Sequence, residues 1–271
     1  MPGSVVERLR AAGCVFAEDE AELLVGAGGD LEALVARRVT GEPLEQVLGW
    51  AEFCGLRVPV EPGVFVPRRR TGLLVREAVA LDPRVVLDLC CGTGAVGLAV
   101  VTALGASIEL HPSVELHPSV ELHPSVELHC ADVDPAAVAC ARRAVAGVGG
   151  RVHLGDLDEP LPADLRGRVD VLVVNAPYVP TGAVALMPPE ARVHEHRVAL
   201  DGGVDGLDLH RRVAAVAPRW VRPGGSVLVE TSERQALATA ELLRRNGFRT
   251  RIVRDDELDA TVAVGILRPR E

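Results

Sequence analysis

Short apolar runs alternate with helix-like segments over most of the chain after residue 80. The runs are rich in β-branched residues, lack the polar alternation of a half-buried strand, and are followed by segments with helical periodicity. Strands buried on both faces are typical of a parallel sheet that helices cover on both sides. The apolar runs occupy residues 85–89, 126–131, 152–154, 169–174 and 226–230, and the helical segments occupy 95–104, 135–146, 205–220 and 232–246.

The two ends of the chain add a hairpin and a helical region. Two C-terminal strands are close enough in sequence to pair as an antiparallel hairpin, which brings the sheet to seven strands. The pattern therefore predicts a doubly wound α/β domain with a mostly parallel seven-stranded sheet over residues 73–271. A small helical domain with a connecting hairpin is expected over residues 1–72. The terminal strands are 249–253 and 261–267, the early helices are 4–13, 19–26, 30–39 and 71–80, and Pro59, Pro62 and Pro67 indicate an irregular or hairpin stretch.

A perfect six-residue repeat, ELHPSV, runs from Glu109 to His129. It places histidines at His111, His117, His123 and His129. Residues six apart in an extended chain are roughly 20 Å apart, too far to share one metal ion, and a proline in each copy prevents a continuous central strand. Only the last copy leads directly into Asp132, so residues 126–131 are expected to form a strand and the other copies an exposed insertion without a metal site.

Composition and charge narrow the class of protein. The 271 residues are 48% apolar and 25% charged, the net charge is −9, and all 29 basic residues are arginine. Acidic chains are poor autonomous partners for nucleic acid, because phosphate contacts dominate that affinity. No apolar stretch approaches the roughly 20 residues of a membrane span, no signal peptide is recognisable, and the cysteines lack CxxC spacing. We expect a cytoplasmic monomer that contacts neither a membrane nor nucleic acid directly.

A glycine-rich turn follows the first apolar run. Gly92-x-Gly94-x-x-Gly97 lies between a predicted strand and a predicted helix, the context in which glycines let the backbone turn sharply and a nucleotide approach its amides. Asp132, at the end of the next strand, can accept hydrogen bonds from ribose hydroxyls. Once the 18 residues of the three extra repeat copies are subtracted, the spacing between the turn and Asp132 suits either a nicotinamide cofactor or S-adenosylmethionine.

Three features favour S-adenosylmethionine. Asp88 lies at the end of the first strand, where a carboxylate suits a cationic methionine group better than a pyrophosphate. The turn at residues 222–225 precedes a strand, and a second acid, Asp156, follows the third strand. The tetrad Asn175-Ala176-Pro177-Tyr178 ends the fourth strand at the same carboxyl edge, where ligands bind in open α/β folds. Capping or turn hydrogen bonds are the alternative role for Asp88 and Asp156.

The tetrad resembles the (N/D)-P-P-(Y/F) motif of methyltransferases that act on planar nitrogens. Methyl transfer from a sulfonium is an in-line displacement, so catalysis depends on positioning the acceptor lone pair. The side-chain carbonyl of Asn175 and the backbone carbonyl of Ala176 can accept the two N–H groups of an amide and stabilise developing positive charge. Pro177 stiffens the turn, and Tyr178, the only tyrosine, offers a flat face to the planar group. A plain strand-end turn is the alternative interpretation.

The chain resembles the bacterial peptide chain release factor glutamine methyltransferases along nearly its whole length. Several matching stretches lie outside the core common to methyltransferases, so the match is stronger than an analogy of fold. The resemblance implies a methyltransferase sheet, S-adenosylmethionine as the methyl donor and a release factor as the protein substrate. Besides the glycine turn and the tetrad, the matching stretches are residues 41–44 with 48–49, 53–56, 62–68 and 199–207.

The resemblance also assigns roles to individual residues. The implied acceptor is the glutamine of a Gly-Gly-Gln tripeptide, held by Asn175, Ala176, Pro177 and Tyr178, while the helical N-terminal domain helps to engage the release factor. Cys90 and Cys91 are expected to be small loop residues rather than nucleophiles. The resemblance implies donor contacts from Cys90, Cys91, Gly92, Thr93, Gly94, Asp132, Leu157 and Asn175, to which the argument from strand ends adds Asp88 and Asp156.

Four departures from the family pattern bear on the substrate. Ala176 replaces the first proline of the tetrad, two cysteines replace the usual glycine and its neighbour, Gly72 replaces the glutamate after Thr71, and the N-terminal domain is short. Three alternatives therefore stay open. The chain could be a paralogue acting on another translation protein such as a ribosomal protein, or a non-catalytic relative that binds a partner. A DNA adenine methyltransferase would need a target-reading module in addition.

Overall fold

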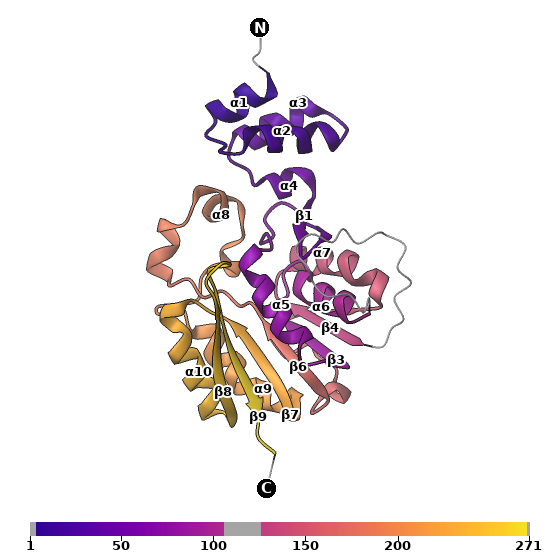
Figure 1. The fold of residues 1–271 in the computed structure, drawn as a ribbon, viewed down its shortest axis with the longest axis vertical. Coiled ribbons are helices and arrows are strands. Elements are labelled where there is room, and N and C mark those ends of the chain that lie inside the picture. Colours follow the sequence, from indigo (N-terminus) through magenta and orange to yellow (C-terminus); the bar gives the residue numbers. More distant parts are fainter. Residues whose placement is uncertain (1–3, 106–125, 270–271) are drawn as a thin grey trace.

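The computed structural model describes residues 4–105 and 126–269, and its N-terminal helices form a small bundle at one end of the molecule (Figure 1). The bundle has its own apolar core, which includes Leu9, Leu24 and Val35. Three of its helices confirm the predicted ones, whereas the fourth spans five residues, too few for a periodicity to be recognised. The helices are α1 (Val5–Ala11), α2 (Ala17–Gly26), α3 (Leu31–Val39) and α4 (Leu44–Leu48).

A β-hairpin connects the bundle to the α/β domain. Its strands are β1 (Trp50–Phe53) and β2 (Leu56–Pro59), and the turn residues Cys54 and Gly55 have φ of 50° and 76°. Two left-handed residues are what a two-residue hairpin turn of matching twist requires. Phe53 belongs to the apolar core beneath the main sheet, so the hairpin is packed on the α/β domain. A 3-10 turn, η1 (Arg69–Thr71), and helix α5 (Gly72–Val79) follow.

The main sheet has seven strands in the order β5-β4-β3-β6-β7-β9-β8. The first five in this order are parallel, and β9 pairs antiparallel with both β7 and β8, which confirms the predicted mixed sheet with a C-terminal hairpin. The order reverses at β3, which lies between β4 and β6, and ligands bind at such switch points. The strands are β3 (Val85–Leu89), β4 (Glu127–Asp132), β5 (Arg151–Leu154), β6 (Val169–Val174), β7 (Val221–Glu230), β8 (Phe248–Asp255) and β9 (Ala260–Leu267).

Helices cover both faces of the sheet, as expected for strands without polar alternation (Figure 1). Val86 and Val171 face one apolar core, to which α5, α6 and α7 contribute, while Leu87 and Leu172 face the other, to which α9 and α10 contribute. The remaining helices are α6 (Ala95–Gly105), α7 (Pro135–Val145), α8 (Pro189–His194), α9 (Asp208–Trp220) and α10 (Ala236–Arg245).

Several predicted boundaries are wrong, and helix α8, like α4, was not predicted. Strand β7 starts at Val221 rather than after the turn at 222–225, because a register shift against β6 between Val169 and Val171 accommodates the exposed turn residues within the strand. Helix α9 starts at Asp208 rather than at 205, since the backbone before it forms a glycine-rich loop. The short helix α8 lies in the long connection after β6, where no periodic pattern exists.

The last copy of the repeat forms β4, as predicted, and its His129 is buried there. The His129 ring stacks on His153 of β5 with ring centroids 5.2 Å apart, and its Nε2 lies 3.0 Å from Glu127. The expected insertion at residues 109–125, with His111, His117 and His123, lies outside the described residues. Within residues 4–105 and 126–269, no group of three potential ligand side chains could hold a metal ion, and no helix is long and apolar enough to cross a membrane.

Candidate active site

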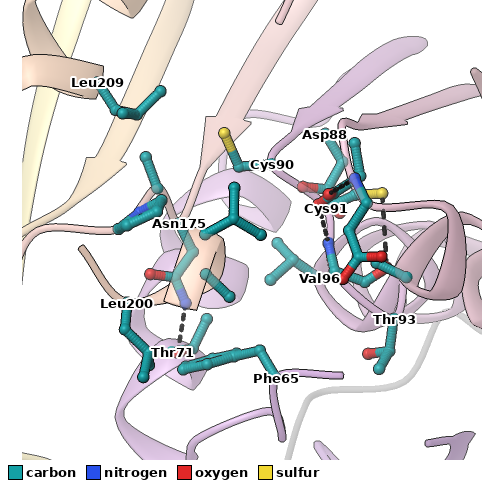
Figure 2. A pocket seen from close by; sticks show the side chains of 18 of the residues that line it. Phe65, Thr71, Asp88, Cys90, Cys91, Thr93, Val96, Asn175, Leu200 and Leu209 are labelled. Atoms are coloured by element: carbon teal, nitrogen blue, oxygen red, sulfur yellow. Dashed lines mark hydrogen bonds between the residues drawn. The ribbon is translucent and has the colours of Figure 1, made fainter. Parts of the chain in front are cut away.

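A cavity of about 340 Å³ opens where β3, β4 and β6 end, at the reversal of strand order. Every residue that the sequence predicted for the site lines this cavity, with the exception of Gly94. Figure 2 shows Asp88, Cys91 and Thr93 on one side of the space and Asn175 and Thr71 on the other. The cavity therefore has a side formed by the glycine-rich turn and a side formed by the tetrad.

The glycines of the turn have different tasks. Gly92 has φ of 53°, and a Cβ built on it would meet no atom within 4 Å, so its backbone is open to the cavity. A Cβ on Gly94 would lie 3.2 Å from Ala141 of α7, and one on Gly97 would lie 2.9 Å from Leu128 of β4. Only the first glycine thus leaves room for a ligand, whereas the other two allow helix α6 to pack closely.

Asp88 is a buried carboxylate in the wall of the cavity, with an exposed fraction of 1%. Its Oδ2 accepts a hydrogen bond of 2.9 Å from the backbone N–H of Gly97, which ties β3 to the first turn of α6. Burial raises the pKa of Asp88 to about 7. A carboxylate whose charge is penalised by burial is stabilised by a cationic ligand. Asp88 can therefore hydrogen-bond the first turn of α6 and also bind a cationic ligand.

Two further acids stand on the same side of the cavity. Asp132, the last residue of β4, accepts hydrogen bonds from the backbone N–H groups of Gly92 (2.8 Å) and Asp134 (2.9 Å). Burial raises the pKa of Asp132. Asp156, in the loop after β5, pairs with Arg212 of α9 at 2.8 Å. These contacts hold both carboxylates in place while they still line the cavity.

The two cysteines of the turn lack the environment of a nucleophile. Burial raises the pKa of the Cys90 thiol, and hydrogen bonding with Cys130 together with burial raises the pKa of Cys91. A nucleophilic cysteine needs the opposite shift, because the thiolate is the reactive form. Cys90 also has φ of 56°, so it occupies a left-handed position that favours glycine.

The tetrad ends β6 on the opposite side of the cavity. The Asn175 Nδ2 donates a hydrogen bond of 3.3 Å to Thr71 Oγ1, and the Tyr178 hydroxyl donates one of 3.3 Å to Glu230 Oε1. Burial raises the pKa of Tyr178, so its hydroxyl stays protonated at neutral pH. No hydrogen bond among the described residues uses the Ala176 carbonyl, which leaves this acceptor available to a ligand.

A glycine-rich loop packs against the backbone of the tetrad and explains the matching stretch at 199–207. A Cβ on Gly202 would lie 2.7 Å from the Pro177 carbonyl oxygen, and a Cβ on Gly206 would overlap the Tyr178 carbonyl oxygen. The Gln235 side chain donates to the carbonyls of Tyr178 and Asp205, each at 3.0 Å, and so joins the tetrad to this loop.

Several residues that complete the site were not predicted from the sequence. Phe65, Arg68, Arg70 and Thr71 line the cavity. Phe65 and Arg68 belong to the stretch 62–68 that was noted only as a resemblance, and Thr71 was noted only because the residue after it departs from the family pattern. Glu230 lies behind Tyr178 with an exposed fraction of 3%. Its position was recognisable, because a charged residue that ends an apolar strand lies at the ligand-binding edge of a parallel sheet.

No family model matches the chain. A release factor glutamine methyltransferase from Geobacter sulfurreducens is 37% identical over 219 residues, 79% of this chain and 69% of that protein. A 4-amino-L-phenylalanine/4-methylamino-L-phenylalanine methyltransferase from Streptomyces pristinaespiralis is 33% identical, over the same shares of each chain. The fold is similar to that of a Pyrococcus furiosus methyltransferase, with a TM-score of 0.53 and 15% identity over 86% of this chain and 98% of the other. The chain belongs to the release factor glutamine methyltransferase family.

Proposed function

We propose that the chain transfers the methyl group of S-adenosylmethionine to the side-chain amide nitrogen of a glutamine in a peptide chain release factor, within its Gly-Gly-Gln tripeptide. The observation that carries the proposal is the shared cavity: the glycine-rich turn with Asp88 and Asp132 faces the Asn175–Tyr178 tetrad across one space. A donor and a planar acceptor held on opposite sides of one cavity can meet in line, which is what methyl transfer requires.

The donor side has the chemical groups that S-adenosylmethionine needs. The donor, when bound, supplies an electrophilic methyl group. Asp88 would hold its cationic amino acid part, because the buried carboxylate is stabilised by a positive charge. Asp132 would accept the ribose hydroxyls, and the open backbone at Gly92 leaves space for the donor to approach. The other residues proposed to contact the donor are Cys90, Cys91, Thr93, Asp156, Leu157 and Asn175, all of which line the cavity. Gly94, which the family resemblance also implied, does not line it.

The acceptor side would orient the amide. The nitrogen of an amide is a poor nucleophile because its lone pair is delocalised into the carbonyl. The Asn175 Oδ1 and the Ala176 carbonyl oxygen would accept its two N–H groups and stabilise the positive charge that develops on the nitrogen. Alanine in place of proline at 176 leaves this backbone acceptor unchanged. Pro177 restricts the backbone conformation of the turn. The Tyr178 ring lines the cavity and would lie beside the amide.

We propose that the helical N-terminal domain, residues 1–72 with its hairpin, contacts the protein substrate. It is linked to the connection after β6, which borders the tetrad: Gln46 Nε2 donates to the His194 carbonyl at 3.2 Å, and Arg38 pairs with Glu190 of α8 at 2.7 Å. A substrate bound to the bundle would thus be positioned relative to the cavity. The proposal includes a monomer that acts in the cytoplasm without contacting nucleic acid directly, in keeping with the net charge of −9.

A second candidate acceptor is an aryl amine on an amino acid. The similarity to the 4-amino-L-phenylalanine methyltransferase favours it, at 33% identity. An aryl amine presents the same planar N–H₂ group to Asn175 and Ala176 as an amide does. The two candidates differ in whether the bundle has a protein to contact.

Methyl incorporation from labelled S-adenosylmethionine separates the two candidates. Purified release factor, a release factor with the tripeptide glutamine changed to alanine, and free 4-amino-L-phenylalanine are each incubated with the enzyme. We expect label only in the unaltered release factor, at one residue by peptide mass spectrometry. Asn175→Ala should lower the rate by roughly 10²–10³-fold through the loss of an oriented carbonyl. Label in the altered release factor, or only in the free amino acid, would refute the proposed substrate.

A further inference from the structure

Tyr178 is held at both of its ends by one short segment, residues 230–235. Its hydroxyl donates a hydrogen bond of 3.3 Å to Oε1 of Glu230, the last residue of β7. Its backbone carbonyl accepts a hydrogen bond of 3.0 Å from Nε2 of Gln235, the last residue of the 3-10 turn η6 (Glu233–Gln235). The segment therefore restrains both the ring and the backbone of Tyr178.

Both the nitrogen and the oxygen of the Gln235 amide are engaged. Besides the Tyr178 carbonyl, Nε2 contacts the Asp205 carbonyl at 3.0 Å, and Oε1 accepts a hydrogen bond of 2.5 Å from the Ser232 hydroxyl. Backbone carbonyls can only accept hydrogen bonds, so the amide must present its nitrogen to both of them. A side chain of similar length without N–H groups could make neither contact.

Glu230 holds the other end of Tyr178 with a single oxygen. Oε1 accepts the Tyr178 hydroxyl, whereas the buried Oε2 has no hydrogen-bond partner among the described residues. The Arg70 Nε lies 3.7 Å from Oε1 and supplies a positive charge near the buried carboxylate. Without Glu230 the Tyr178 hydroxyl would lose its acceptor in a largely buried place, at a cost in free energy.

The tetrad transmits this restraint to the carbonyl of Ala176. The peptide plane between Ala176 and Pro177 is rigid, and the proline ring fixes φ of residue 177, so few free torsions separate the Ala176 carbonyl from that of Tyr178. The other end of the turn is held by β6, where Val174 pairs with Val229 of β7. The position of the Ala176 carbonyl is therefore determined from the two ends of the turn.

We propose that Gln235 and Glu230 are positioning residues for methyl transfer, which hold Tyr178 at its carbonyl and its hydroxyl and thereby fix the Ala176 carbonyl that receives the acceptor N–H. This inference rests on the proposed amide methylation, because the acceptor must have an N–H group. Neither residue lines the cavity, so each acts through the tetrad and not on the donor or the substrate.

Two substitutions of Gln235 remove its N–H groups. Gln235→Met has a similar length and no donor, and Gln235→Glu has the same shape but, when ionised, only accepts hydrogen bonds. We expect kcat to fall roughly 10–100-fold in both, because small misplacements at a reacting centre have effects of this order. The affinity for S-adenosylmethionine, measured by calorimetry, should not change. Arg234→Met, at an exposed position of the same 3-10 turn, is the matched control and should keep the kcat of the unaltered enzyme.

A pair of substitutions at Glu230 tests the hydroxyl end of Tyr178. Glu230→Gln keeps a carbonyl oxygen that can accept the Tyr178 hydroxyl and should retain kcat within about threefold. Glu230→Met offers no such acceptor, so kcat should fall roughly tenfold or more. Equal kcat in the two variants would exclude Glu230 from the proposed role.

Nuclear magnetic resonance gives a readout that does not depend on turnover. Tyr178 is the only tyrosine of the chain, so tyrosine labelled with ¹³C at its carbonyl carbon yields one signal, from the carbonyl that Gln235 contacts. Loss of a hydrogen bond to a carbonyl moves its carbon signal upfield. We expect this shift in Gln235→Met and in Gln235→Glu, and an unchanged signal in Arg234→Met.

The inference requires a fall in kcat and a shift of the Tyr178 carbonyl signal together, in a variant that still binds S-adenosylmethionine. Retention of kcat within twofold in Gln235→Met, or an unshifted carbonyl signal, would overturn it. If Gln235→Met does not fold, Gln235→Glu takes its place; if neither folds, Gln235 supports the fold as a whole and the positioning role is refuted. If the unaltered enzyme methylates no glutamine, the proposed function fails, whereas the carbonyl signal still decides whether Gln235 holds Tyr178.

Discussion

Arg38 of the N-terminal bundle donates a hydrogen bond of 2.7 Å to Glu190 of α8, across 152 positions of sequence. The same guanidinium binds Glu20 of α2 through two hydrogen bonds, of 2.6 and 3.0 Å, and is almost fully buried. Arg38 thus joins the bundle internally and also links it to the connection that borders the tetrad. The two ion pairs differ in burial, since the Glu190 side chain is half exposed.

This difference predicts that the two pairs have separable effects. Arg38→Met leaves Glu20 buried without a counter-charge, so the free energy of unfolding should fall by about 3–5 kcal/mol. Glu190→Gln breaks only the half-exposed pair and should change stability by less than about 1 kcal/mol. Because it loosens the link to the bundle, Glu190→Gln should still raise the KM for the release factor.

Chemical denaturation and steady-state kinetics check both statements. The KM for S-adenosylmethionine is the internal control and should be unchanged in Glu190→Gln, because Glu190 does not line the cavity. An unchanged KM for the release factor in that variant would argue against a role of the bundle in binding the protein substrate.

The periodic parts of this fold were predictable from sequence, and the long connection after β6 was not. Strand β6 was predicted to the residue, because a short run in which five of six positions are apolar and buried has few other conformations. Helix α8 depends on contacts that sequence does not display, such as the bridge between Gly63 and Glu195 and the 2.6 Å pair between His196 and Asp134. Local pattern carries no information about such distant partners.

The residues of the candidate site also divide into those that the local pattern predicts and those that depend on distant contacts. Residues such as Asp88, Asp132 and Asn175 were predictable because each ends a strand at the carboxyl edge, where the fold assembles ligands. Thr71 was not assigned a role, since its contact with Asn175 joins residues 104 positions apart. Gly94 was expected to contact the donor, yet a Cβ built on it would face Ala141 instead of the cavity. The motif fixes which backbone turn forms and leaves open which glycine faces the ligand.

Gly206 is predicted to be essential because of the space it leaves rather than because of its backbone conformation alone. Its φ is 75°, and a Cβ would overlap both the Tyr178 carbonyl oxygen and the Gln235 side chain. Gly206→Ala must therefore displace the tetrad, and we expect kcat to fall at least roughly tenfold, because small misplacements at a reacting centre have effects of this size. Affinity for S-adenosylmethionine should change much less.

Gly167→Ala is the matched control for Gly206→Ala. Gly167 has a similar φ of 67°, but a Cβ there would meet nothing within 4 Å. It should lose only about 1 kcal/mol of stability from backbone strain and keep its activity. Equal losses of activity in the two variants would show that backbone strain, and not contact with the tetrad, explains the effect.

His210 is expected to make the protein sensitive to acid. It lies on α9 beneath Tyr178, its Nδ1 is 3.0 Å from the Thr239 hydroxyl, and burial lowers its pKa to about 4. The unfolded chain takes up this proton near pH 6.5, whereas the folded protein does not until about pH 4. Its contribution to stability is therefore intact above pH 6.5 and declines by ~3 kcal/mol as the pH falls from 6.5 to 4.

Denaturation curves at neutral and acidic pH test this contribution. His210→Gln cannot be protonated, so it should lose less stability between the two conditions than the unaltered protein does. His194→Gln, which changes a histidine that is not fully buried, should follow the unaltered protein. Parallel pH dependence of all three proteins would contradict the assignment.

Asp88 should make donor binding and stability depend on pH in opposite directions: stability falls as the pH rises, and donor affinity falls as the pH drops. Because burial raises its pKa from 3.8 to about 7, the donor-free protein is stabilised by this group below pH 3.8 and loses ~4 kcal/mol as the pH rises through 7. A cationic donor needs the ionised form, so its affinity should instead weaken about tenfold per unit as the pH falls below 7. Asp88→Asn should then be more stable than the unaltered protein at pH 8 and bind S-adenosylmethionine weakly at every pH. Calorimetric titration between pH 6 and 8.5 measures the affinity, and denaturation between pH 4 and 8.5 measures the stability, with the exposed Asp164→Asn as the control. A donor affinity in Asp88→Asn that matches the unaltered protein at pH 8 would exclude a charge interaction at this site.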